Sequence, residues 1–222
     1  GTLWVGTVEG GLNRRAPQEK AFIHFTTANS ALPHNSVSAL AADGHGHLWV
    51  GTWGGGVCLF DMKAPGAITR LDLSETYARL TNFIGALAYD PINDGMWVGS
   101  NDGVFFYDFK TRQLIEPFDG CRDVRGCIGS IVTSDGQLWM GGIRGLSIID
   151  LRSRGEAGFR SRAIFHLLDD PDSRIVDKIC AFCETKDGTL WLGSNGYGLY
   201  KRVVGEDGSE RFQAFTVEDG LV

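Results

Sequence analysis

Few residues of this 222-residue sequence have the types and spacing that catalysis or metal binding requires. Cys180 and Cys183 form a CxxC pair, but no second pair and no nearby histidine completes the four donors of a zinc site. These thiols are better explained as small apolar side chains of a core. His34 and His166 lie in different expected loops without an identifiable partner, which favours solvated side chains over a catalytic base. We therefore expect no metal site and no cofactor.

Aspartates recur at similar places along the chain, each just before a glycine. Asp-Gly supplies the backbone angles of a tight hairpin turn, so turn formation explains the recurrence. A catalytic pair of carboxylates would instead occur once and break the pattern. The sequence also lacks HExxH, GxSxG and phosphate-binding motifs, and we expect a segment without catalytic activity. The recurrent pairs are Asp43-Gly44, Asp94-Gly95, Asp135-Gly136 and Asp187-Gly188.

A second group of residues has the types that bind a carbohydrate. An aromatic face suits the apolar side of a sugar ring, and planar amide or guanidinium groups suit its hydroxyl or acidic groups. Trp53 could also simply cover a neighbouring part of the fold, and we keep both interpretations. The candidates in the turns after a repeated Leu-Trp-Val-Gly motif are Trp53, Asn101, Arg144, Asn195 and Tyr197. The candidates in the links between repeats are His34, Asn82, Arg125 and Arg174.

The elements that would position these residues follow from an internal repeat. Five of the six tryptophans lie in this motif, and successive ones are 45, 48, 42 and 52 positions apart. A four-stranded propeller blade has about 40 to 50 residues, so the spacing fits one blade per repeat. The motif tryptophans are Trp4, Trp49, Trp97, Trp139 and Trp191, and the glycines that end the later copies are Gly51, Gly99, Gly141 and Gly193.

Each repeat divides into four short strand-like pieces without a helical period. The first piece always has a small second residue, as close approach of backbones around a propeller axis requires. We expect this column, Ser38, Gly85, Gly129 and Cys180, to line a central channel. The predicted fold is an all-β propeller of four-stranded antiparallel blades, here about five with one innermost strand missing. Its single domain spans 1–222, with blades at about 1–33, 34–81, 82–125, 126–174 and 175–222.

The composition and charge of the sequence limit the classes of partner that we expect. The formal charge is −6 and no run of Lys or Arg occurs, which argues against a nucleic-acid partner. No stretch approaches the roughly 18 apolar residues that span a membrane. The 31 glycines and 6 prolines fit many tight turns between short strands. A propeller closes only when its last blade meets its first, so we expect the parent protein to continue beyond both ends.

The stretch from Asp187 to Tyr200, Asp-Gly-Thr-Leu-Trp-Leu-Gly-Ser-Asn-Gly-Tyr-Gly-Leu-Tyr, resembles the regulator-propeller repeat of bacterial two-component sensors. Leu32-Pro33-His34-Asn35-Ser36-Val37 is similar to the Gly-Leu-Pro-x-Asn-x-Val link between blades of that family. The resemblance covers the whole chain. The chain departs from the pattern at Ala31, at Ile143-Arg144 and near Arg122 to Gly126.

The resemblance implies a periplasmic sensor region of an inner-membrane receptor, often a hybrid histidine kinase. It implies an oligosaccharide or other small extracellular ligand, a homodimer formed through the parent receptor, and membrane contact only through the parent's transmembrane helix. Two other classes stay open. A propeller enzyme of the lyase or glycosidase type would use its central cavity for acid–base chemistry, and a protein-interaction scaffold would show an exposed apolar patch.

Overall fold

Five antiparallel sheets make up the chain in the computed structural model. The first sheet has three strands and the other four have four strands each, in meanders whose chain neighbours are hydrogen-bonded. The only helix among the described residues is the 3-10 turn η1 (Val217–Asp219). The all-β fold and the number of blades are thereby confirmed. The structure describes residues 1–64, 66–71, 73, 83–118, 125–143, 145–165 and 178–221.

The strands take four equivalent places in the sheets. The first strands are β4 (Val37–Ala42), β8 (Ile84–Asp90), β12 (Gly129–Val132) and β16 (Ile179–Glu184). The second strands are β1 (Leu3–Gly6), β5 (His47–Thr52), β9 (Gly95–Ser100), β13 (Gln137–Gly142) and β17 (Leu190–Ser194). The third strands are β2 (Leu12–Arg15), β6 (Gly56–Asp61), β10 (Gly103–Asp108), β14 (Gly145–Gly155) and β18 (Leu199–Val204). The fourth strands are β3 (Ile23–Phe25), β7 (Ile68–Leu71), β11 (Gln113–Ile115), β15 (Gly158–Phe165) and β19 (Glu210–Phe215).

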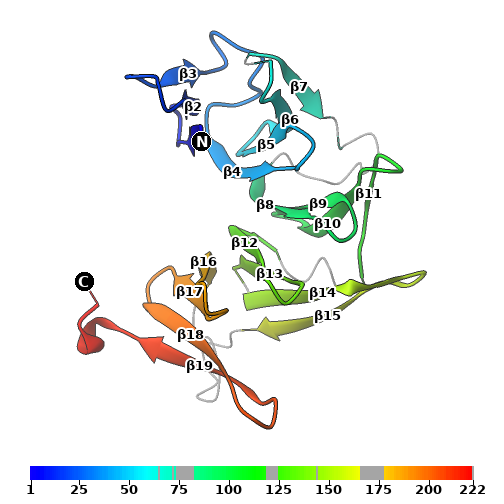
Figure 1. Cartoon of the computed structure of the whole chain (residues 1–222), viewed down its shortest axis with the longest axis vertical. Coiled ribbons are helices and arrows are strands. Elements are labelled where there is room, and N and C mark those ends of the chain that lie inside the picture. Colours follow the sequence, from blue (N-terminus) through cyan, green and yellow to red (C-terminus); the bar gives the residue numbers. More distant parts are fainter. Residues whose placement is uncertain are drawn as a thin grey trace.

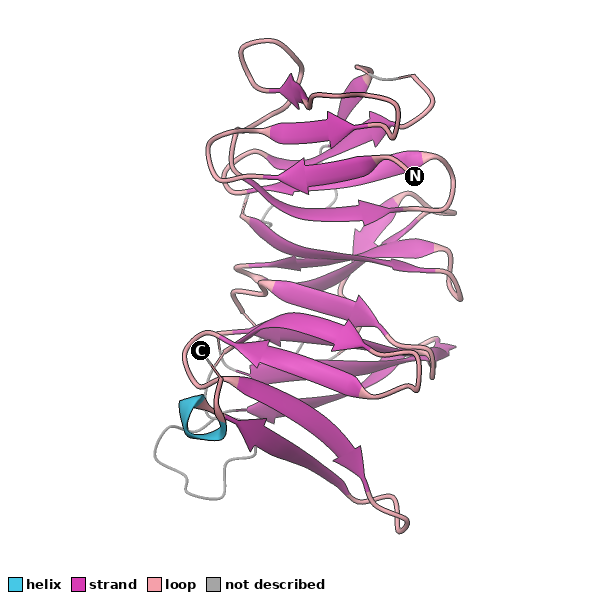
Figure 2. Cartoon of the chain, turned by 60° about the vertical axis from the view of Figure 1, so that its left-hand side comes forward, coloured by secondary structure: helices cyan, strands magenta, loops and turns pink. Residues whose placement is uncertain are grey.

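The sheets follow one another around an arc (Figure 1). The first strands lie on the inner side of this arc and the fourth strands on its outer side, as in the blades of a propeller. In the turned view of Figure 2 the blades lie in successive layers, with η1 close to the C-terminal end. We number the blades 1 to 5 along the chain. Blade 1 is the three-stranded sheet β1-β2-β3, which lacks the first strand.

The glycine that ends each Trp-containing motif is required by close packing between blades. A Cβ atom added at Gly51 would lie 2.7 Å from Cγ2 of Ile84. At Gly141 it would lie 2.1 Å from the carbonyl oxygen of Ile179. Both contacts are far shorter than van der Waals distances, and both lead to the start of the next blade's first strand. The repeat glycine therefore sets how closely two blades approach.

Close packing between neighbouring blades also explains the small residues at the second position of the first strands. A Cβ atom at Gly85 would lie 1.8 Å from the carbonyl oxygen of Cys127, and one at Gly129 would lie 2.6 Å from that of Cys180. The Ser38 hydroxyl donates a hydrogen bond to the Ile84 carbonyl of the next blade. This is the expected close approach around the axis. Gly85 itself is buried, because the next first strand covers it.

The motif tryptophans of blades 1 to 4 each fill the wedge between their own blade and the next. Trp97 is fully buried, and its ring centroid lies 4.9 Å from that of Phe159 in blade 4. Trp49 is 2% exposed and lies 5.4 Å from the ring of Tyr107 in blade 3. Burial of one large apolar side chain contributes about 1.5–3 kcal/mol. The tryptophans therefore stabilise the junctions between blades as much as the blades themselves.

The hairpin turns between first and second strands use two chemistries. In blades 2 and 3 a buried aspartate ends the first strand, and Asp90 accepts the backbone N–H groups of Ile92 (2.9 Å) and Asn93 (3.0 Å). In blade 4 Thr133 takes that place and donates to Asp135 at 2.5 Å. The expected role of Asp-Gly needs one correction. The positive φ in blade 3 belongs to Asp94 (50°) rather than to the following glycine, which instead packs under Phe106.

Several strand boundaries also differ from those that the repeat predicts. The first strand of blade 4 is predicted over 128–133 and begins at Gly129, and the fourth strand of that blade is predicted over 162–167 and begins at Gly158. The long β14–β15 hairpin explains the second difference, because a bulge between Asp150 and Gly155 extends the pairing outward. Among the described residues no helix has the length and apolar character of a membrane span.

Candidate functional site

One face of the arc carries the turns between second and third strands together with the links that enter the first strands. We call it the link face. On it, the residue two places after a repeat glycine donates its backbone N–H to a link carbonyl. Each of blades 2 to 5 thereby presents one turn residue and one link residue at equivalent places around the axis. These hydrogen bonds join Trp53 to Ser36 (2.9 Å), Asn101 to Phe83 (3.3 Å), Ile143 to Arg125 (3.1 Å) and Asn195 to Lys178 (3.1 Å).

A cavity of about 320 Å³ opens on the link face across blades 2 to 5, within the lower range of small-ligand sites. Successive turns and links supply its walls, so the regular repeat brings together residues far apart in the sequence. Blades 3 and 4 add both turn and link residues, whereas blade 2 adds one turn residue and blade 5 adds one link residue. The described residues that line it are Trp53, Phe83, Asn101, Gly126, Ile128, Ile143 and Lys178.

Aromatic rings make up one wall of this cavity. Trp53 and Phe83 form an isolated antiparallel bridge between the turn of blade 2 and the link into blade 3. Trp53 is 51% exposed and Phe83 is 45% exposed, whereas the motif tryptophans of blades 2 to 4 are buried. The register explains the contrast, because Trp53 lies beyond the end of β5, where no adjacent strand covers it. An exposed indole beside an exposed phenyl ring offers a flat apolar surface to a ligand.

The polar groups around the cavity are donors and amides. Asn101 is exposed, Lys178 is half-buried and Arg125 is exposed beside Gly126. None of the described lining residues carries a carboxylate or an imidazole. This lining can therefore hold a ring and bind acceptor groups. It does not itself supply an acid–base pair.

The structure brings some of the sequence-predicted residues together and separates others. Trp53 and Asn101 line the same cavity, and the Arg125 carbonyl holds the Ile143 turn at its edge. His34 lies behind this wall, where its ring packs against Gly54 and its Nδ1 accepts the Ser36 backbone N–H at 3.0 Å. Two further predicted residues that the structure describes, Asn195 and Tyr197, do not line the cavity.

Asn195 and Tyr197 lie on the turn of blade 5. They follow β17 and are exposed on the link face. The Tyr197 backbone N–H is held by the Ser194 hydroxyl at 3.0 Å. Three further predicted residues, Asn82, Arg144 and Arg174, fall outside the described residues, and so does His166.

Sequence reasoning missed Phe83, Ile143 and Lys178. All three occupy places equivalent to residues that were predicted, since each is the turn or link residue of its blade. Aligning the repeats on the motif glycine would have found Ile143, two places after Gly141. Phe83 and Lys178 each come directly before a first strand. Ile143 is 56% exposed, so the turn of blade 4 adds an apolar side chain where the prediction relied on Arg144.

The four thiols that the structure describes do not line this cavity. Burial raises the pKa of Cys58 and of Cys127 to about 12, which leaves both in the unreactive thiol form. Cys180 and Cys183 are three residues apart on β16 and therefore point to opposite sides of the strand. The Cys180 thiol donates to the Gly193 carbonyl at 3.6 Å. In the described part of the chain, no group of three or more His, Cys, Asp or Glu residues could hold a metal ion.

Comparisons with known proteins agree with this repeat architecture. Residues 31–54 and 173–196 match the family model of the two component regulator propeller. Histidine kinase P4 of Formosa agariphila is 30% identical over 108 residues, which cover 47% of this chain and 8% of that kinase. The chain thus spans less than a tenth of this relative.

Solved structures share the fold over nearly the whole chain. One is the extracellular domain of a protein assigned as a hybrid two component system of B. thetaiotaomicron, with TM-score 0.76 and 21% identity over 100% of this chain and 28% of that chain. Another is PorZ, a surface component of the type-IX secretion system of Porphyromonas gingivalis, with TM-score 0.66 and 20% identity over 97% and 32%. The family match and the arc of five blades lead to one conclusion. Two segments of the chain, 31–54 and 173–196, are similar to two-component regulator propeller repeats.

Proposed function

We propose that this chain is part of the extracytoplasmic, ligand-binding region of a two-component receptor, and that its link face binds an oligosaccharide. The observation that carries the proposal is the exposure of aromatic rings. Trp53, Phe83 and Tyr197 are the aromatic side chains that are exposed among the described residues, and all three lie on the link face. A soluble surface rarely leaves such rings open without a partner.

The chemistry around these rings suits a sugar. Stacking needs a flat ring such as the Trp53 indole, and hydroxyl groups need donors and acceptors such as the Asn101 amide and the Lys178 ammonium. The lining supplies no carboxylate or imidazole, which supports binding without turnover. We place the segment in the periplasm, as part of an inner-membrane receptor that acts as a homodimer.

Calorimetry of the intact protein against a panel of oligosaccharides tests this proposal. Trp53→Ala should weaken binding about fivefold or more, because loss of one stacking platform removes roughly 1–3 kcal/mol of interaction. Ile92→Ala is a matched control. The exposed fraction of Ile92, 47%, is similar to the 51% of Trp53, but Ile92 lies in a turn on the opposite face. Binding that survives both Trp53→Ala and Phe83→Ala, with an unchanged circular dichroism spectrum, removes the link face as the site.

A second function, docking of a second copy of this chain, is favoured by one specific observation. Trp53, Phe83 and Ile143 are each 45% exposed or more around one cavity, which is the apolar patch expected of an interaction surface. In that case no oligosaccharide of the panel should bind. The same Trp53→Ala substitution should then change the oligomeric state of the intact protein in analytical ultracentrifugation.

A further inference from the structure

A larger cavity lies on the face opposite the link face. We call it the hairpin groove, because the turns of β4–β5, β8–β9 and β10–β11 form its mouth. Its volume is about 530 Å³, well within the range of small-ligand sites. It lies between blades 2 and 3, so residues of both blades line it. Those that carry the argument are Trp49, Tyr107, Phe109, Arg112, His47 and Asp94.

The interior of the hairpin groove is apolar and flat. The rings of Trp49 and Phe109 are stacked, with centroids 5.5 Å apart and an angle of 21° between their planes. Tyr107 packs beside them at 5.4 Å from Trp49. Phe109 also stacks on Tyr89, with centroids 6.1 Å apart, yet it is only half-buried and part of its ring lines the groove. A ring with one apolar face fits this floor.

The two carboxylates at the mouth already have partners. Asp43 accepts the His45 backbone N–H at 2.8 Å, the His47 ring at 2.9 Å and the Trp49 indole N–H at 3.3 Å. Asp94 accepts the Tyr89 hydroxyl at 3.2 Å and pairs with the His45 ring at 2.7 Å. The Asp94–His45 bond joins the two turns across the blade boundary, and all of these bonds give the two carboxylates hydrogen-bond donors within the protein.

The groups left without a partner in the hairpin groove are donors. The Arg112 guanidinium forms no ion pair with any described residue. Tyr107 is only 9% exposed, yet its hydroxyl forms no hydrogen bond with any described residue. Burial raises the pKa of Tyr107, and the positive charge of Arg112 acts against this rise. Both residues line the groove, where the hydroxyl and the guanidinium can bond a ligand atom.

We propose that the hairpin groove binds a sugar ring that carries a carboxylate. The ring lies against Phe109, the Arg112 guanidinium pairs with the carboxylate, and Tyr107 with the imidazole of His47 bonds the hydroxyl groups. Arg is suited to the carboxylate because two parallel N–H donors match its two oxygens. This site is separate from the oligosaccharide site on the link face and does not depend on it.

The test compares two ligands that differ only in the acidic group. Methyl glucuronide should bind the intact protein at least about tenfold more tightly than methyl glucoside, because only the former pairs with Arg112. Arg112→Gln should abolish this preference. Tyr107→Phe should weaken both ligands without changing the preference, since it removes one hydroxyl and keeps the ring packing.

Two variants and one further ligand complete the design. Lys110→Gln removes an exposed cation beside the groove that does not line it, and Trp53→Ala removes the indole of the link face; both should leave methyl glucuronide binding within twofold. Equal affinity for the two glycosides, no binding of either, or an unchanged preference in Arg112→Gln overturns the proposal. Tighter binding of benzoate than of methyl glucuronide would overturn the assignment of a sugar ring.

Discussion

The junction between blades 2 and 3 and the junction between blades 4 and 5 hold equivalent tryptophans by different chemistries. At the former, the Trp49 indole N–H donates to Asp43 and its ring packs on Tyr107 and Phe109. At the latter, the Trp139 indole N–H has no partner among the described residues. Its ring lies instead 4.9 Å from the guanidinium carbon of Arg202.

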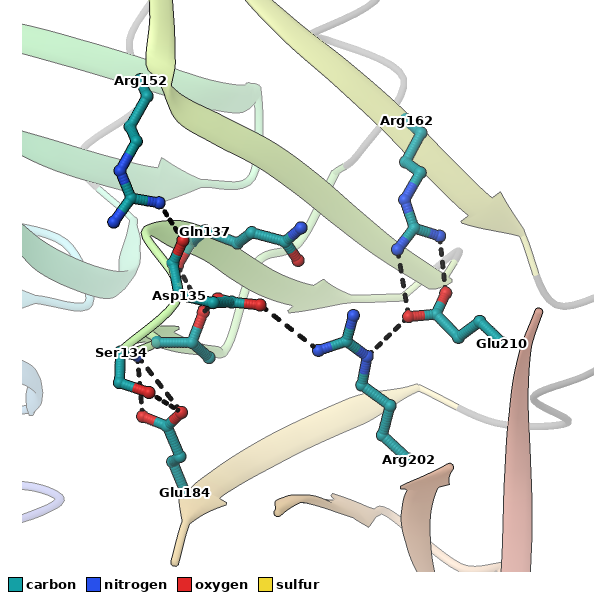
Figure 3. Close-up of polar contacts among 9 residues, drawn as sticks. Ser134, Asp135, Gln137, Arg152, Arg162, Glu184, Arg202 and Glu210 are labelled. Atoms are coloured by element: carbon teal, nitrogen blue, oxygen red, sulfur yellow. Dashed lines mark hydrogen bonds and ion pairs between the residues drawn. The ribbon is translucent and has the colours of Figure 1, made fainter. Parts of the chain in front are cut away.

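Figure 3 shows an ionic network at this second junction, and two of its arginines, Arg162 and Arg202, lie over the Trp139 ring. Glu210 accepts from Arg162 at 2.7 and 3.1 Å and from Arg202 at 2.6 Å, and Arg202 reaches Asp135 at 3.6 Å. Arg162 comes from blade 4 and Glu210 from blade 5, so the network joins the outer parts of two blades. The comparison teaches that the repeat specifies a wedge-shaped tryptophan but leaves its neighbours free. At the first junction aromatic rings pack against Trp49, whereas at the second the guanidinium groups of an ionic network pack against Trp139.

The largest expected effect is common to both junctions. Trp49→Ala and Trp139→Ala should each lower the free energy of unfolding by about 3–5 kcal/mol, because a large core side chain leaves a cavity. Trp→Phe should separate the two positions. At position 49 the substitution removes the hydrogen bond from Trp49 to Asp43, which is worth about 1 kcal/mol. At position 139 it removes no hydrogen bond to a described residue. Urea denaturation measures both pairs, and equal losses in the two Trp→Phe variants would contradict this distinction.

A smaller effect is expected only at the ionic junction. Glu210→Gln should lower the free energy of unfolding by about 1–3 kcal/mol, because the Glu210 side chain is 10% exposed and both of its arginine partners lose their charged acceptor. Arg160→Gln is the control, since the Arg160 side chain is 80% exposed and its pair with Asp150 is worth about 0–1 kcal/mol. If Glu210→Gln lowers the free energy of unfolding no more than this control does, the ionic network does not stabilise the junction.

The smallest effect is the dependence of this difference on pH. Burial acts to raise the pKa of Glu210, but hydrogen bonds from Arg162 and Arg202 hold it below the ordinary value of 4.5. A lowered folded-state pKa gives stability that is present above pH 4.5 and lost as the pH falls through the lower folded value. The melting temperatures of the parent and of Glu210→Gln should therefore converge as the pH falls below about 4. A constant gap between them down to pH 3 would argue against the ionised carboxylate as the source.

The sequence by itself determined the blades. Trp and Gly in the repeated motif, small residues in the first strands, and turn residues after them act through local backbone geometry and through neighbours at a constant offset in the repeat. The repeat pattern predicts first strands over 37–42 and 179–184, and β4 and β16 have these same bounds. Gly51 and Gly141 also follow from the repeat alone, because each meets the same place on the next blade.

Only the tertiary structure decided which residues meet at the sites. Trp53 joins Phe83 because a link returns beside the turn, and Phe83 carries no local sign of exposure in the sequence. Tyr107 and Arg112 line one cavity together with His47 of the adjacent blade. Arg162 pairs with Glu210, 48 positions later in the sequence. These pairings depend on the register and spacing of whole blades. A single strand's period records which side chains leave the sheet, but only the packed blades determine what those side chains contact.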